Sequence, residues 1–281
     1  MVIKMFKLGF CHFHCFFFIN FHFSDFFPGL FRRFIRHKNV LTQGQRQQRL
    51  NFAQQHQFRT LDEWRKVCWT DEKWCGSWHK YAHRISRPKN SAHNTELLAE
   101  YSRSGYRYGV MFHGAVCATL PPPGENGQVD RRQRYGKLIR VNGSLDSFQY
   151  CEIMDEQLPH LQSLFDPEDD QFLIVHDNAR PHVSQLTVGH LNNYHAYATF
   201  LQWPSNSPDL NLIESCWAIL SYSINRLKNE LGNPRNAEDL WALIELGWVL
   251  VSESDLIESL VLTMPDRMQE LIKNNGGHTH Y

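Results

Sequence analysis

The stretch QFLIVHDNARPHVSQLTVGHLNNYHAYATFLQWPSNSPDLNLIESCWAIL, residues 171–220, decides the fold. Its first apolar run, Phe172 to Val175, is short and partly β-branched, which predicts a buried strand. Asp177 follows at the point where that strand reaches the surface, and Ala198 to Leu201 predicts a second short strand. Ser207-Pro208-Asp209 then predicts a helix start, with a Ser cap, a Pro in the first position and an acid in the first turn.

The helix predicted after Ser207 carries a carboxylate beside a buried face. Its apolar residues recur at spacings of three and four, at Leu210, Ile213, Trp217 and Leu220. Glu214 falls on the neighbouring polar face. A strand-end aspartate and a helix-borne glutamate suit a hard divalent cation, which needs several oxygen ligands. Upstream, the apolar run from Val67 ends in Asp71-Glu72, which supplies a third carboxylate.

Three blocks of sequence carry a resemblance to a known family. WTDE at 69–72, HDNARPH at 176–182 and SPDLNLIE at 207–214 resemble the three catalytic blocks of the Tc/mariner-type DDE transposases. The resemblance covers residues 37–281 and includes the ending GGHTHY. It implies that Asp71, Asp177 and Glu214 are both the catalytic residues and the metal ligands.

The family implies an α/β, ribonuclease-H-like fold, in which helices flank a mixed central sheet and a helical tail ends the chain. The order of strands and helices alone indicates only an α/β fold with a mixed sheet. Further strands are predicted at 78–87, 109–118 and 137–141, and a helix at 145–164. We therefore expect three parts: a Phe-rich, disordered N-terminus at 1–36, a helical lead-in at 37–65 and the catalytic domain at 66–281.

The chemistry implied by the resemblance is cutting and joining of DNA phosphodiesters with two Mg²⁺ or Mn²⁺ ions. The residues expected to support the site are Asn178, His182, Asp209 and Asn211. His182 is predicted either to orient Asp177 or to contact a phosphate, and Asn178 either to bond near the metal or to cap a helix. Glu72 is expected to be solvated. His113, where the family usually has Trp, is expected to be a core histidine.

Composition gives no overall support for DNA binding, because 29 basic residues balance 29 acidic ones. DNA contacts are therefore expected from local patches. The candidates are Arg46, Arg49, Arg131, Arg132 and Arg134. The last three form the most basic patch expected to be exposed, whereas the first two lie on a helix face that an ordinary solvated surface would also explain.

Two classes of function follow from these observations. The first is a nuclear DNA transposase and endonuclease acting on DNA, with a homodimer as a further expectation. The second is an inactive or domesticated transposon remnant that serves as a nucleic-acid- or protein-binding module. The family carries helix-turn-helix modules ahead of the catalytic region, and nothing in residues 1–36 resembles one, so weak DNA binding without sequence preference is expected. A membrane span is not expected, since no run of 18 apolar residues occurs.

Overall fold

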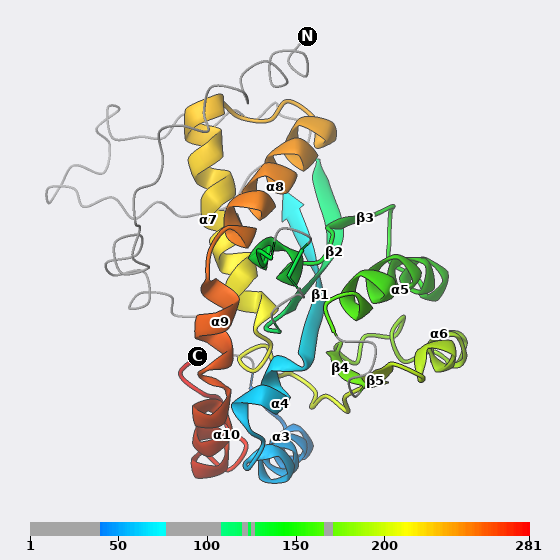
Figure 1. The fold of residues 1–281 in the computed structure, drawn as a ribbon, viewed down its shortest axis with the longest axis vertical. Helices are drawn as coiled ribbons and strands as arrows, with labels where there is room; N and C mark the ends of the chain where they lie inside the picture. The colour runs from blue at the N-terminus through cyan, green and yellow to red at the C-terminus, as the bar shows by residue number, and fades with distance from the viewer. Residues whose placement is uncertain (1–39, 77–107, 120–122, 125–126, 166–170) are drawn as a thin grey trace, which may run out of the picture. The chain divides into compact units, whose positions relative to one another are not determined.

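The computed structural model describes residues 40–76, 108–119, 123–124, 127–165 and 171–281 (Figure 1). The segment predicted to be disordered at 1–36 and the strand predicted at 78–87 lie outside these ranges. Within the ranges, none of the helices is both long enough and apolar enough to cross a membrane.

A five-stranded sheet lies at the centre of the described region, in the spatial order β3-β2-β1-β4-β5. Its strands are β1 (Val67–Gly76), β2 (Gly109–Cys117), β3 (Ile139–Val141), β4 (Phe172–Val175) and β5 (Ala198–Phe200). β1 pairs antiparallel with β2, and β2 with β3. β4 lies parallel to β1, and β5 parallel to β4. The sheet is therefore mixed, as predicted.

Helices cover both faces of this sheet because β1 is apolar on both. Val67 and Trp69 belong to the core cluster built with α7 (Ile213–Leu231) and α8 (Ala237–Ser252). Cys68 belongs to the opposite cluster, built with α5 (Ser147–Gln162). Successive side chains of a strand point to opposite faces, so residues of β1 alternate between these two cores. Figure 1 shows α5 on one side of β1 and β2, and α7 with α8 on the other.

The remaining helices frame the sheet. They are α3 (Gln43–His56), α4 (Leu61–Arg65), α6 (Gln185–Leu191), α9 (Leu256–Val261) and α10 (Met264–Lys273). Thr42 and Thr60 each begin a helix with a reciprocal capping box, which satisfies the free backbone N–H groups of the first turn. α3 and α4 lie in the segment predicted as a helical lead-in, and α10 packs against α3 although the two are far apart in sequence.

The helix predicted to start at Ser207 starts instead at Ile213, so that prediction is wrong. Residues 207–212 form successive turns, in which Leu210 N donates to Ser207 O and Asn211 N donates to Pro208 O. The Ser207 hydroxyl does not cap a helix, because it donates to Ser205 O and accepts a bond from Arg49 Nη1 at 2.9 Å. The contact with Arg49 on α3 thus takes the place of the helix cap predicted for Ser207. The helix predicted from residue 145 likewise starts at Ser147, where the Asp146 side chain caps it.

Gly276 lies where the C-terminal segment crosses α3. Its φ is 72°, and a Cβ built there would lie 1.9 Å from Arg46 O. Gly143 has the same φ of 72° but no atom within 4 Å of a built Cβ.

We expect Gly276→Ala to destabilise the protein more than Gly143→Ala. The left-handed backbone should cost each variant about 1–2 kcal/mol, and the overlap with Arg46 should add about 1–3 kcal/mol at Gly276. Urea unfolding of the two variants measures the difference. Equal losses would contradict the close packing of the C-terminal segment on α3.

Candidate active site

The fold places the end of β4 beside the middle of β1. β1 and β4 are parallel neighbours, with Trp69 opposite Val175. Asp71 and Asp177 each lie two residues further along: Asp177 follows the end of β4, whereas β1 continues to Gly76, so Asp71 lies within its strand and not at its end. Glu214 lies in the first turn of α7, a helix that packs against β1. Segments up to 143 positions apart in sequence thus carry the three predicted acids on β1, after β4 and on α7, which are neighbouring elements.

Asp71 lies on the α7 side of β1 and is held by a tryptophan. Trp217 Nε1 donates to Asp71 Oδ2 at 3.0 Å. Burial raises the pKa of Asp71 to about 7, and the negative charges of Glu214 and Glu72 add to this rise. Asp71 and Glu214 are therefore close enough for their charges to interact, and the described part of the site holds excess negative charge around Asp71.

Asp177 has different surroundings. Its Oδ1 accepts a bond from Ala179 N at 2.8 Å, which forms a local turn after β4. The same oxygen lies 2.8 Å from His182 Nδ1. The hydrogen bond from His182 lowers the pKa of Asp177, and the bond from Ala179 N acts in the same direction. The side chain is 57% exposed, so this carboxylate is accessible from solvent.

The other predicted supporting residues hold the loops around the acids. Asn178 Nδ2 donates to Trp203 O at 3.0 Å and ties the end of β4 to the loop after β5. Asn211 Nδ2 lies 3.4 Å from Thr70 O, next to Asp71 in β1. Asp209 is buried away from the acids, where it forms an ion pair with Arg49. Asn211 and Asp209 thus anchor the loop that leads into α7.

A buried polar cluster behind Asp177 was not predicted. Glu72 was expected to be solvated, but its side chain is only 9% exposed and its Oε2 lies 3.2 Å from His182 Nε2. His113 is fully buried, as expected, and its Nε2 lies 4.0 Å from Glu72 Oε1. Strand alternation indicates that Glu72 is buried, because Asp71 faces α7 and the next residue of β1 must face the opposite side of the sheet, which α5 covers.

The two histidines of this cluster differ in charge. Burial lowers the pKa of His113 to about 4, so its ring is neutral at pH 7. Burial acts on His182 in the same direction, but hydrogen bonds to Asp177 and Glu72 outweigh it and raise the pKa to about 10. His182 is therefore a cation between two carboxylates.

The donor chemistry of the three acids fits a hard divalent cation. Carboxylate oxygens are its preferred ligands, and Asp71 and Glu214 already concentrate negative charge. Within the described ranges, however, no group of three or more His, Cys, Asp or Glu side chains is gathered closely enough to hold a metal ion. Asp71 instead accepts its bond from Trp217, and Asp177 from His182. Without a cation between them, the three carboxylates repel one another, and Asp71 and Asp177 are stabilised by these two donors instead.

Two of the five arginines predicted to contact DNA cannot do so from this fold. Arg49 is fully buried, and Arg134 is 3% exposed. Arg134 Nε donates to Thr119 O, and its Nη2 lies 3.3 Å from Glu258. The expectation of an exposed position is therefore wrong for both, because partners from distant segments satisfy their guanidinium groups.

The other three predicted arginines are exposed. Arg131 and Arg132 are each about 60% exposed but pair with acids, Asp255 and Asp130 respectively. Arg46 is exposed on α3. Arg180, which was not among the predicted contacts, is exposed three positions after Asp177 and brings a positive charge to the segment that follows β4.

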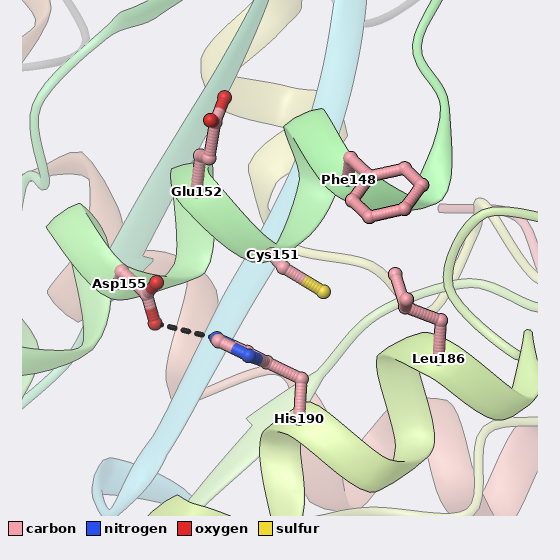
Figure 2. Close-up of a pocket in the computed structure, with 6 residues that line it drawn as sticks. All are labelled: Phe148, Cys151, Glu152, Asp155, Leu186 and His190. Atoms are coloured by element: carbon pink, nitrogen blue, oxygen red, sulfur yellow. Dashed lines mark hydrogen bonds and ion pairs between the residues drawn. The ribbon is translucent and has the colours of Figure 1, made fainter.

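A separate hollow of about 440 Å³ lies between α5 and α6 (Figure 2). The residues that line it are Phe148, Cys151, Glu152, Asp155, Leu186 and His190. His190 Nε2 lies 2.7 Å from Asp155 Oδ1. None of the predicted catalytic residues lines this hollow, and its two acids make it unsuitable for a DNA backbone.

Comparisons with known proteins show which proteins this chain resembles. A family model described as DDE superfamily endonuclease matches residues 148–233. The chain is 27% identical to the Tc1 transposase of Caenorhabditis elegans over 249 residues, which are 87% of this chain and 81% of that protein. The matched family region includes Asp177 and Glu214.

Solved structures show the same fold. The Mos1 mariner paired end complex with Mn matches with a TM-score of 0.57 and 14% identity, over 86% of this chain and 65% of that one. The Mos1 transposase catalytic domain with Raltegravir and Mg matches with a TM-score of 0.55 and 14% identity, over 86% of this chain and all of that one (100%). The prediction of a ribonuclease-H-like fold is thereby confirmed.

Proposed function

Because the chain carries a DDE transposase catalytic domain of the Tc/mariner type, we propose that it cuts and joins DNA phosphodiesters with the help of divalent metal ions. The observation that supports this proposal is that β1, β4 and α7, the elements that carry or precede the acids Asp71, Asp177 and Glu214, are neighbours, and that the charge of Glu214 raises the pKa of Asp71. The chemistry of these acids suits the binding of cations.

Asp71, Asp177 and Glu214 would hold two ions, Mg²⁺ or Mn²⁺. When bound, such ions activate a water or a DNA 3′-hydroxyl and stabilise the leaving oxygen of the phosphodiester. The chain itself supplies rigidity. Trp217 fixes the Asp71 carboxylate from α7, and Asn211 ties the loop before Glu214 to the backbone of β1.

DNA is the proposed partner, and the nucleus is the proposed location. Arg180 is exposed three positions after Asp177 and would contact the phosphates of bound DNA, while Arg46, Arg131 and Arg132 are the other exposed candidates. Phosphate contacts of this kind position DNA without reading its sequence. We further propose a homodimer, since the joining of two DNA ends requires two active sites.

Removal of metal tests the proposed activity directly. The full chain should nick supercoiled plasmid DNA in Mn²⁺ or Mg²⁺, should lose that activity in EDTA, and should regain it when Mn²⁺ is returned. The reason is that carboxylates alone cannot activate water for attack on a phosphodiester at neutral pH. The measurement is the conversion of supercoiled to open circular plasmid with time.

Nicking that persists in EDTA would contradict the proposal. DNA binding with no nicking in any divalent metal would instead support a transposon remnant that acts as a binding module. A filter-binding titration with the same plasmid, run in parallel at two salt concentrations, separates these outcomes.

A further inference from the structure

His182 is held between the carboxylate of Glu72 in β1 and that of Asp177, which follows β4. Its Nδ1 lies 2.8 Å from Asp177 Oδ1, at the end of β4. Its Nε2 lies 3.2 Å from Glu72 Oε2, in β1. The residue is 2% exposed, and Nε2 has no hydrogen bond of good geometry, so the nearby Glu72 carboxylate acts on it as an ion-pair partner.

Aromatic neighbours prevent the His182 ring from turning. The Tyr150 ring lies against it with centroids 4.1 Å apart. The His176 ring is stacked on it at 5.4 Å, with an angle of 13° between the planes. Tyr150 OH lies 2.8 Å from His176 Nδ1, which fixes the two neighbours to each other. The imidazole can therefore transmit the position of one carboxylate to the other.

Glu72 is the unexpected member of this arrangement. A carboxylate that is 9% exposed is costly to bury unless charged or polar partners compensate. Its partners are His182 and, more distantly, His113 on β2, the residue opposite it across the strand pair. Glu72 directly follows Asp71 in β1, so the two side chains point to opposite faces of the sheet. Asp71 faces α7, and Glu72 faces His182, the partner of Asp177.

We infer that Glu72 is a positioning residue, which acts through His182 to set the orientation of the Asp177 carboxylate. This inference rests on the proposed function, because it assigns Asp177 the task of binding a divalent ion. Carboxylates and histidines that hydrogen-bond a ligand in this way commonly change metal affinity by about 10–100-fold when they are replaced. Glu72 itself would touch neither metal nor DNA.

The test compares Glu72→Gln with Asp155→Asn in the full chain. Asp155 also pairs with a histidine, His190, but in the hollow between α5 and α6, so its replacement is a matched control. Mn²⁺ binding is measured by EPR titration, and nicking is measured as a function of Mn²⁺ concentration. E72Q should bind Mn²⁺ about 10–100-fold more weakly than the native chain and should recover most of its nicking rate at saturating Mn²⁺. D155N should match the native chain in both measurements.

Unchanged Mn²⁺ affinity in E72Q would overturn the inference, even if the melting temperature falls, because a merely structural residue would show that pattern. Asp177→Asn separates the inference from the proposed function. If D177N loses Mn²⁺ and E72Q does not, only the inference fails. If D177N binds Mn²⁺ as tightly as the native chain, the proposed function fails and the inference fails with it.

A measurement on the native chain covers the case in which E72Q does not fold. Titration with diamagnetic Mg²⁺ should shift the side-chain ¹⁵N resonances of His182, since its partner Asp177 changes its bonding when it binds a cation. The His190 resonances should stay in place. Absence of any His182 shift at saturating Mg²⁺ would overturn the inference.

Discussion

Asp71→Asn is expected to reduce metal-dependent nicking by about a thousandfold or more, since loss of a metal ligand removes several kcal/mol of transition-state stabilisation. Asn has almost the shape of Asp and can still accept the bond from Trp217 Nε1. The fold should therefore survive while the charge disappears. The measurement is the initial rate of plasmid nicking at saturating Mn²⁺, with D155N as the control.

The same substitution should increase stability at alkaline pH. Burial and the charges of Glu214 and Glu72 raise the pKa of Asp71 from 3.8 to about 7, so the folded state binds this proton more tightly than the unfolded chain. Ionised Asp71 then destabilises the fold increasingly as pH rises from about 4 to 7. D71N should melt at a higher temperature than the native chain at pH 8, with a smaller difference at pH 5. An active D71N, or one that melts lower at pH 8, would contradict the assignment of Asp71.

Arg49→Met is expected to destabilise the protein by about 3–5 kcal/mol, because it leaves the buried Asp209 carboxylate without its counter-charge. Both oxygens of Asp209 accept bonds from Arg49, at 2.8 and 2.7 Å, and the pair has side-chain exposures of 0% and 5%. Arg49 also donates to Gly276 O and Gly277 O, each at 3.0 Å. The loss should appear as a lower midpoint in urea unfolding.

Arg226→Gln is the matched control for this prediction. Arg226 pairs with Glu230 on α7 at 2.8 Å, but both side chains are 52% exposed. Replacement should cost about 0.5 kcal/mol or less, since solvent screens such a pair. If R49M and R226Q destabilise the chain equally, the Arg49–Asp209 pair does not connect α3, the α7 loop and the C-terminal segment in the way that the contacts indicate.

Some features of the site could be predicted from local sequence. The apolar run before Asp177 predicts a buried strand, and the spacing of Ile213 and Trp217 predicts the helix that carries Glu214. Both elements are observed. Arg49 was misjudged although an indication existed: it shares a helical face with Phe52, Ala53 and His56, all of which are buried. The helical period therefore places Arg49 on the inward face of α3.

The sequence by itself determined the central strands, the α/β class and, through three blocks in order, the family and the three acids proposed for the site. Periodicity suffices there because it reports which face of an element is apolar. Only the tertiary structure decided which segments cover those faces. Asp209, predicted as an acid in the first turn of a helix, instead meets Arg49, 160 residues away, and Glu72 in β1 meets His182 in the segment after β4. A polar side chain is buried where a distant partner satisfies it, and local sequence carries no record of that partner.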